Sequence, residues 1–446
     1  MSAEGDRVRK ILTRILYTMF FGFTLSLIVS CVLFIADSVN KKDDQLLTAV
    51  SIDPKSENSS VYKKIDSGDD SVPVHYMTDC EYGYNTLSDP GEQFIYRKLQ
   101  RNLYYITDEK DDNGYYKTER IILSGSELSE SSVRKALNAF IADHPQIFWV
   151  SNIFGYAYDS GDTVVECYSV VSAEKCREYS NILNAKVNEF VEETAEAESD
   201  YQKERILHDM LLRGCTYADN VKTMDDGWEY FTSYGAIISG SAVCEGYSKA
   251  MQLLLSASGV RSYIIRGNAE GVRHMWNLVQ LGDDWYHLDA TWNDGDSYVS
   301  YEYFNLPTEI IKENHDIGAM IGTGDSESDE SSPNFFLPEC ESMNYNYYNV
   351  DGFTIERFDN ETDQQMVAFI LNCVNNDCHY LHLNVGDEME YEECIDTLFH
   401  APTHRIYHYI DLANEFLDSD HRLDREGMRI LKHENRKTIR IRLSYK

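Results

Sequence analysis

The first strong feature along the chain is an unbroken apolar run near its start. Residues 15–36 (ILYTMFFGFTLSLIVSCVLFIA) hold 22 positions without a charge. A helix of that length covers about 33 Å, which is enough to cross a bilayer. The pattern therefore predicts a transmembrane helix over 15–36 after a short segment, 1–14. Residues 37–75 are polar without a sustained apolar period, which predicts a stalk or linker.

Helix-like and strand-like patterns alternate beyond residue 75. Apolar side chains recur at helical spacing over 133–141, and residues 154–158 and 163–170 flank an Asp-Ser-Gly-Asp turn that favours a hairpin. These patterns predict an α+β protein. We expect four consecutive parts, which are an α/β segment over 76–199, a core over 200–316, an acidic linker over 317–334 and a small α/β domain over 335–446.

Charge separates the apolar start from the rest of the chain. Acidic residues number 75 against 40 basic ones, a net charge of −35. Residues 1–45 carry six basic and five acidic side chains, a net of +1, so residues 46–446 carry −36. A field of that sign repels phosphate backbones, and we expect no nucleic-acid partner.

The basic residues before the apolar run predict the topology. Arg7, Arg9, Lys10 and Arg14 favour a cytoplasmic amino terminus, a single-pass anchor and an extracytoplasmic remainder. A cleaved signal peptide and lipoprotein processing at Cys31 are the alternatives. The run is longer than a signal-peptide core and stays apolar beyond Cys31, which favours the uncleaved signal-anchor.

Ten cysteines are scattered along the chain without the dense spacing of a disulfide scaffold. The nearest metal-like cluster, Cys373, Cys378, His379 and His382, has spacing that supports zinc poorly and is better interpreted as buried thiols and surface imidazoles. No dinucleotide or phosphate-binding glycine motif occurs. We therefore expect no metal and no other cofactor.

A possible nucleophile lies at the start of a helix. The apolar stripe formed by Ala250, Leu253, Leu254 and Ala257 begins just after Cys244. A helix amino terminus favours an anion, because its first N–H groups point outward and the macrodipole is positive there. A thiol in that position is favoured as the nucleophilic thiolate.

Two strands downstream supply a possible base and carboxylate. Strands are expected over 274–281 and 285–291, joined at Gly282 and Asp283. If the loop has an even number of residues, position 281 pairs with 284, and His274 and Asp289 project from the same face. A three-residue loop without a bulge would put them on opposite faces. Cys244, His274 and Asp289 then form a nucleophile, a base and an orienting carboxylate.

Three sequence blocks resemble those of the transglutaminase-like superfamily, which has a papain-like thiol fold. They are SAVCEGYSKA around Cys244, RHMWN around His274 and WYHLDATWND around Asp289. The resemblance implies a helix bearing the cysteine packed on an antiparallel sheet bearing the histidine and aspartate, as in bacterial membrane-anchored members. It also implies an oxyanion hole built from the Cys244 backbone N–H and one further donor. Tyr234 is our candidate for that donor, with simple packing as the alternative.

The resemblance implies attack on an amide to give a thioester. We expect a cysteine protease, hydrolase or acyltransferase acting on a peptide, protein or cell-wall peptide substrate, with water or an amine as the acceptor. The sequence shows no ordered calcium loop, because the acidic stretch 294–296 is too short. The competing hypothesis is a non-catalytic surface module that keeps the fold and binds a protein partner.

Overall fold

The computed structural model describes residues 47–55, 61–65, 81–111, 114–295, 298–317, 338–376, 378–400 and 402–446. The transmembrane helix predicted for 15–36 and nearly all of the acidic linker predicted for 317–334 lie outside these residues. Within the described residues, no helix has the length and apolar character needed to cross a membrane.

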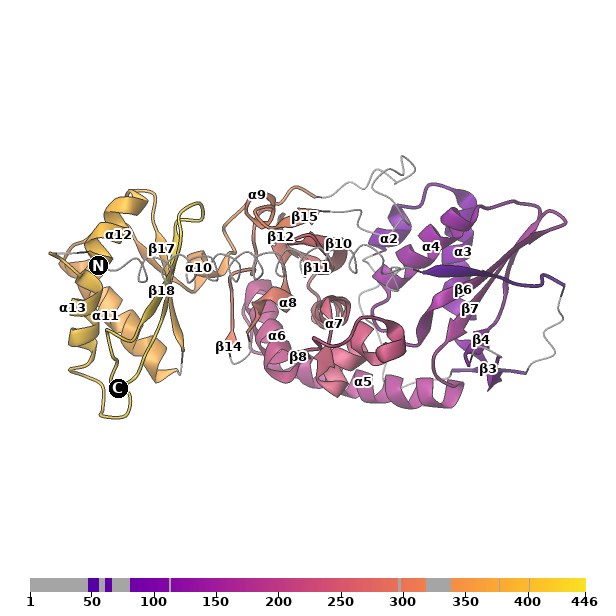
Figure 1. Cartoon of the computed structure of the whole chain (residues 1–446), viewed down its shortest axis with the longest axis horizontal. Coiled ribbons are helices and arrows are strands. Elements are labelled where there is room, and N and C mark those ends of the chain that lie inside the picture. Colours follow the sequence, from indigo (N-terminus) through magenta and orange to yellow (C-terminus); the bar gives the residue numbers. More distant parts are fainter. Residues whose placement is uncertain are drawn as a thin grey trace, which may run out of the picture. The chain divides into compact units, whose positions relative to one another are not determined.

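The first part of the chain forms a seven-stranded sheet with helices against it (Figure 1). Six strands follow the order β1-β6-β7-β4-β3-β2, and β5 pairs with β7. The elements are β1 (Thr48–Ser51), β2 (Tyr62–Lys64), α2 (Tyr82–Asn85), α3 (Pro90–Asn102), β3 (Tyr105–Lys110), β4 (Tyr116–Thr118), β5 (Ile121–Leu123), α4 (Glu130–Asp143), β6 (Val150–Asp159) and β7 (Asp162–Ser169).

The predicted hairpin is the centre of this sheet. Asp159 pairs with Asp162, and the turn residues Ser160 and Gly161 have φ of 56° and 96°. Positive φ at both central positions is the geometry of a tight hairpin turn that matches the twist of the strands. The hairpin is confirmed.

The first two strands differ from the stalk expected over 37–75. β1 runs parallel to β6, and β2 runs antiparallel to β3. Both are only three or four residues long and half-exposed, so they show no apolar period in the sequence. Their place at the sheet edges depends on hydrogen bonds to strands that are distant in the chain.

The next part of the chain falls in the range 200–316 predicted as a core, together with α5 before it. Its four-stranded sheet has the order β12-β11-β10-β15, and helix α7 packs on β10 and β11. The elements are α5 (Ala173–Glu193), α6 (Asp200–Gly214), β8 (Thr216–Tyr217), η1 (Met224–Asp226), η2 (Trp228–Phe231), the π-helix η3 (Gly235–Ser239), β9 (Ser241–Ala242), α7 (Cys244–Ala257), β10 (Ser262–Ala269), β11 (Val272–Leu281), β12 (Asp284–Leu288), α8 (Ala290–Asn293), β13 (Asp294–Gly295), β14 (Tyr298–Val299), α9 (Thr308–Ile311) and β15 (His315–Ile317).

A second hydrophobic core defines the C-terminal α/β domain. Its sheet has the order β16-β17-β19-β18, and α11 packs against β16, β17 and α13 (Figure 1). The elements are α10 (Tyr347–Val350), β16 (Phe353–Ile355), α11 (Asn360–Asn375), β17 (Tyr380–Val385), α12 (Tyr391–Phe399), α13 (Arg405–Ala413), β18 (Arg429–His433) and β19 (Thr438–Arg442).

The hydrophobic cores divide the chain differently from the expected ranges. One continuous core runs from Leu47 to Cys340 and so joins the 76–199 segment to the 200–316 core. Tyr345 and Tyr347 also pack on that core, whereas the second core starts at Phe353 and Ile355. Cys340, Tyr345 and Tyr347 therefore pack on the first core, although they lie in the range 335–446 expected for the C-terminal domain, and α10 also contacts β16 and β17.

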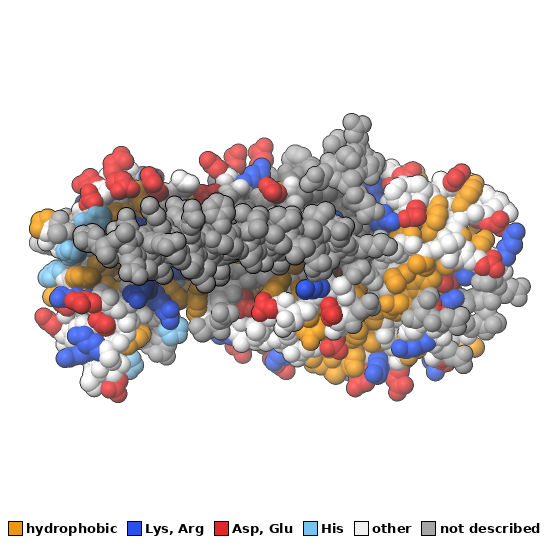
Figure 2. Space-filling model, in the orientation of Figure 1, with side chains coloured by type: hydrophobic (Ala, Val, Ile, Leu, Met, Phe, Trp, Pro, Cys, Tyr) orange, Lys and Arg blue, Asp and Glu red, His pale blue; other side chains and the backbone are white. Residues whose placement is uncertain are grey.

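Acidic side chains occur across the visible surface. In Figure 2 they are spread over the face, whereas basic side chains stand in small groups and form no continuous patch there. This distribution matches the net charge of −35.

Helix α7 begins in tight contact with the preceding chain. A Cβ on Gly246 would lie 2.6 Å from the carbonyl oxygen of Tyr230 and 2.7 Å from the Cβ of Ala242. Real side-chain atoms do not approach that closely, so only glycine lets the first turn of α7 pack against this segment.

We predict that Gly246→Ala lowers the free energy of unfolding by about 1–3 kcal/mol, because the added methyl group overpacks a buried contact. Gly214→Ala is the matched control, since its Cβ would meet no atom within 4 Å. It should be neutral or slightly stabilising at a helix position. Urea unfolding followed by circular dichroism measures both, and equal effects would contradict the close-contact explanation.

Candidate active site

Cys244 is the first residue of α7 and is buried. Val243 before it is extended, with φ −93° and ψ 178°, and the thiol residue is 4% exposed. The N–H groups of the first helical turn have no partner within the helix, so the sulfur lies at the positive end of the helix dipole. This is the placement that the apolar stripe predicted.

His274 and Asp289 are joined by a short hydrogen bond. His274 lies on β11, and Asp289 follows β12 and caps α8. The Nε2 of His274 is 2.6 Å from Oδ2 of Asp289. The two-residue turn aligns Leu281 with Asp284, which is the even register that the pairing required. The sequence argument for a shared face is thus supported by the observed register.

Cys244 is the third member of the group that contains His274 and Asp289. Cys244 is one of the neighbours that raise the pKa of His274. Because Nε2 is occupied by Asp289, the other ring nitrogen, Nδ1, is the one available to sulfur. The three predicted residues are therefore brought together in the order thiol, imidazole, carboxylate.

The local field strongly favours a protonated imidazole. Burial opposes a charge on His274, but the charge and hydrogen bond of Asp289, together with the contact to Cys244, outweigh it and raise the pKa of His274 to about 10. Burial likewise acts to raise the pKa of Asp289, yet the two neighbouring histidines hold it well below its usual range. The pair is a buried imidazolium and carboxylate at neutral pH.

A second histidine shares the carboxylate. His315 on β15 is 1% exposed, and its Nε2 lies 3.0 Å from the same Oδ2 of Asp289. Its Nδ1 lies 2.7 Å from Oδ1 of Asn314, and the N–H of Trp292 donates to Oδ1 of Asp289 at 3.1 Å. No sequence pattern predicts that His315 lies at the site, because β15 reaches the site only through its pairing with β10.

His274, Asp289 and His315 also form a possible ligand set. Among the described residues their donor atoms lie within 4.8 Å of one another, and two imidazoles with one carboxylate can bind a divalent metal. Here hydrogen bonds of 2.6 and 3.0 Å already join these atoms, and protonation of His274 removes the lone pair that a metal needs. We assign the group to hydrogen bonding.

Tyr234, the predicted oxyanion donor, lies in an aromatic cluster. Its ring centroid is 5.0 Å from that of Tyr179, 5.1 Å from Phe148 and 6.1 Å from Trp228. The residue is 7% exposed, and burial raises the pKa of its hydroxyl. This arrangement fits the packing alternative, and the structure does not bring Tyr234 to the triad.

A different tyrosine lies near the thiol. Tyr217 on β8 pairs with Ala242, two residues before Cys244. Burial raises the pKa of Tyr217 to about 12, and the charges of Cys244, Asp219 and Asp289 act in the same direction. Tyr217 is 39% exposed, so part of the residue is in contact with solvent. Only the parallel pairing of β8 with β9 reveals this residue.

Tyr217 and Asp219 also line a large cleft. It has a volume of about 940 Å³, and its lining also includes Asp294 of the core and Asn376 and Tyr380 of the C-terminal domain. The size suits a peptide segment or a comparable ligand.

Residues 188–290 match the transglutaminase-like superfamily. This range contains Cys244, His274 and Asp289, and it confirms the resemblance found in the three sequence blocks. No curated protein matches the chain.

Several solved structures are similar at low identity. A TGase is 17% identical over 40% of this chain and 52% of its own, with a TM-score of 0.24. A proposed cysteine protease from Cytophaga hutchinsonii is 10% identical over 50% of this chain and 75% of its own, with a TM-score of 0.23. The periplasmic domain of TgpA from Pseudomonas aeruginosa is 14% identical over 29% and 56%, with a TM-score of 0.20. The match spans about half the length of the TGase.

We predict a pH-dependent contribution of His274 to stability. Its folded-state pKa of about 10 exceeds the ordinary value of 6.5, so the stabilisation is complete below pH 6.5 and is lost as the pH rises through about 10. The difference in unfolding free energy between wild type and His274→Gln should therefore shrink by at least about 1 kcal/mol from pH 6 to pH 10.5. Urea titrations at both pH values measure it, and a difference that grows with pH would contradict the ion pair.

Proposed function

We propose that the protein is a thiol-dependent amide hydrolase or acyltransferase with Cys244 as nucleophile, His274 as general base and acid, and Asp289 as the orienting carboxylate. The observation that carries the proposal is the convergence of these three side chains, with the buried 2.6 Å bond between His274 and Asp289. A nucleophile hydrogen-bonded to a base that is itself oriented by a third group is the arrangement that thiol catalysis requires.

His274 carries the proton from the thiol to the leaving group. In the resting site the thiol proton has already passed to Nδ1 of His274, which gives the imidazolium described above, and the thiolate attacks the carbonyl carbon of an amide. The C–N bond then breaks while the imidazolium returns the proton to the leaving amine, which leaves an acyl thioester on Cys244. Water or an amine attacks the thioester with His274 again as base, and the thiol is regenerated.

The developing oxyanion needs two donors. The backbone N–H of Cys244, at the start of α7, is the first. Tyr217 replaces Tyr234 as our candidate for the second, because Tyr217 lies beside the nucleophile whereas Tyr234 packs among aromatic rings.

The cleft beside Tyr217 is our candidate for substrate binding. Its polar lining and its volume favour a peptide, a protein segment or a cell-wall peptide over a small apolar ligand. We further propose that this chemistry takes place outside the membrane, with residues 15–36 as the anchor, on the strength of the apolar run and the basic residues that precede it.

The second candidate is a non-catalytic binding module that keeps the fold. A module of that kind has no need of a buried carboxylate that carries two histidines, because such a charge is costly unless it is fully satisfied. The complete triad therefore favours the enzyme.

Selective alkylation tests the nucleophile. We predict that iodoacetamide at pH 6 labels Cys244 at least about tenfold faster than Cys378, because an imidazolium adjoins the first thiol. Cys378 is the matched control, since it is partly exposed whereas Cys244 is buried, so that access alone predicts the opposite order. Mass spectrometry of tryptic peptides gives both rates, and equal rates would contradict the proposal that Cys244 is the nucleophile.

Activity assays separate catalysis from binding. We predict that Cys244→Ala and His274→Ala each lower kcat/KM by about a thousandfold or more in hydrolysis of a peptide library or in amine incorporation. Cys394→Ala, in the second core and outside the cleft, should leave both activities unchanged. If the two triad variants retain wild-type turnover, the protein is a binding module or acts through another site.

His315 is expected to position Asp289. His315→Gln keeps a donor at a similar reach but loses the rigid ring, so kcat should fall about tenfold with little change in KM. The same assay gives both constants, and an effect confined to KM would place His315 in substrate binding instead.

A further inference from the structure

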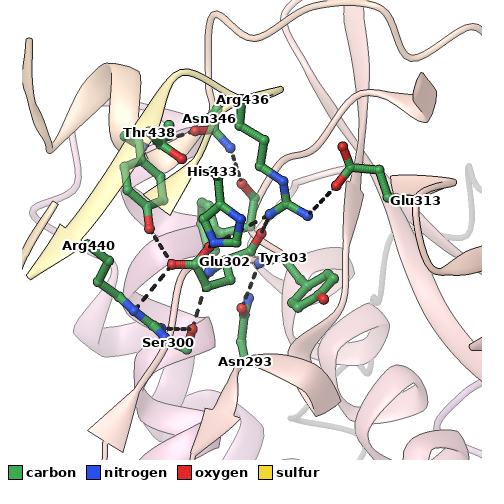
Figure 3. Close-up of polar contacts among 12 residues, drawn as sticks. Asn293, Ser300, Glu302, Tyr303, Glu313, Asn346, His433, Arg436, Thr438 and Arg440 are labelled. Atoms are coloured by element: carbon green, nitrogen blue, oxygen red, sulfur yellow. Dashed lines mark hydrogen bonds and ion pairs between the residues drawn. The ribbon is translucent and has the colours of Figure 1, made fainter. Parts of the chain in front are cut away.

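A buried carboxylate lies where the C-terminal domain meets the catalytic core. Glu302 belongs to the segment between β14 and α9 and is 7% exposed (Figure 3). Around it, Figure 3 shows His433, Arg436 and Arg440, which come from the β18–β19 hairpin of the C-terminal domain. A carboxylate so placed requires opposite charges or hydrogen bonds, and here the other domain supplies them.

The contacts to Glu302 are numerous and direct. Nε2 of His433 is 3.0 Å from Oε2, and Nε of Arg440 is 3.4 Å from Oε1. The Tyr348 hydroxyl donates to the same carboxylate. Although burial opposes its charge, the bonds to His433 and Tyr348 and the charge of Arg440 lower the pKa of Glu302 to about 2. Glu302 is therefore ionised throughout the physiological range.

Arg436 reaches past the carboxylate to the backbone. Its Nη1 donates to the Glu302 carbonyl oxygen at 2.9 Å, and its guanidinium lies 5.7 Å from the ring centroid of Tyr303. Its Nη2 is 3.4 Å from Oε2 of Glu313, and the side chain is 7% exposed. Arg436 thus holds the Glu302–Tyr303 peptide on one side and Glu313 on the other (Figure 3).

That segment is bonded to Asp289 along two routes. The Tyr303 carbonyl accepts the backbone N–H of Asp289 at 2.9 Å. Nδ2 of Asn314 donates to the Tyr303 hydroxyl at 2.6 Å, and Asn314 contacts His315, which bonds the Asp289 carboxylate. Both routes pass through Tyr303, the residue over which Arg436 lies.

We propose that Arg436 is a positioning residue through which the C-terminal domain aligns Asp289 for its partnership with His274. The inference rests on the proposed function and gives the C-terminal domain a role in it. When Arg436 is lost, Tyr303 and the Asn314–His315 pair lose their common support, and the Asp289 carboxylate moves relative to the imidazole. The imidazolium is then less stabilised, and the Cys244 sulfur becomes less reactive toward alkylation near neutral pH.

The pH dependence of Cys244 alkylation tests this in the full chain. For each protein, iodoacetamide rates at pH 6.5 and pH 10 give a ratio that reports how much thiolate is present near neutrality. We expect Arg436→Gln to lower this ratio about fivefold or more while the rate at pH 10 stays near that of wild type. Arg442→Gln is the matched control, because Arg442 is exposed at the end of β19, the strand that follows Arg436, and its replacement removes the same charge.

Labelling of other thiols separates misalignment from unfolding. Cys340 in the first core and Cys394 in the second are buried, so both should stay unlabelled if the variant is folded. If Arg436→Gln exposes them, the milder variants Arg436→Lys and Glu313→Gln test the positioning role instead. Arg436→Lys keeps a cation at this position, and Glu313→Gln leaves no buried charge without a partner. Both variants should lower the ratio of the two alkylation rates, but by a smaller factor than Arg436→Gln does.

Two results would overturn the inference. The first is a folded Arg436→Gln protein with the wild-type ratio, because Arg436 would then have no positioning role. The second applies if Arg436→Gln is unfolded: the wild-type ratio in both Glu313→Gln and Arg436→Lys would exclude the same role. Failure of the proposed function looks different, because Cys244 of the wild-type protein would then react no faster than Cys378, and the positioning role would fall with it.

Discussion

The buried charge of Asp289 is the constraint on which the rest of the site depends. The residue is fully buried, and a carboxylate in that environment is strongly destabilising unless donors surround it. Three elements supply those donors, which are His274 from β11, His315 from β15 and the Trp292 N–H from α8. The same arrangement holds the His274 ring in the orientation that leaves Nδ1 available to sulfur. The contacts that satisfy the buried charge of Asp289 therefore also orient His274, the proposed base.

The packing around α7 explains how the nucleophile keeps its place. Every residue from Cys244 to Ser256 is buried, and the helix contacts α5, α6 and the β10–β11 hairpin. Because one hydrophobic core includes the seven-stranded sheet and this helix, the N-terminal α/β segment supports the site instead of standing apart from it. The close contact at Gly246 sets how near the first turn of α7 can come to the chain before it.

The C-terminal domain has its own core, and its polar contacts with the rest concentrate on the chain that follows Asp289. Buried ion pairs of this kind contribute little net stability, because desolvation offsets much of the attraction. Their main effect is to make the position of the partners specific. The cluster at Glu302 fits that pattern, since it joins the β18–β19 hairpin to a segment that hydrogen-bonds the catalytic loop.

Local sequence patterns were sufficient to predict those features that depend on interactions between residues close together in the chain. The apolar stripe placed Cys244 at a helix start, and the two-residue turn at Gly282 and Asp283 set the register that brings His274 and Asp289 to one face. Periodicity and turn geometry act over a few residues, so they are legible in the chain itself.

What the tertiary structure decided depends on contacts between distant segments. The edge strands β1 and β2 gain their hydrogen bonds from strands that lie far along the chain, so the polar pattern over 37–75 did not reveal them. His315 and Tyr217 reach the site only through the pairing of β15 with β10 and of β8 with β9. Tyr234, by contrast, packs among aromatic rings from separate segments. The sequence by itself determined the three residues of the proposed triad and their order along the chain, and long-range pairing alone determined which neighbours surround them.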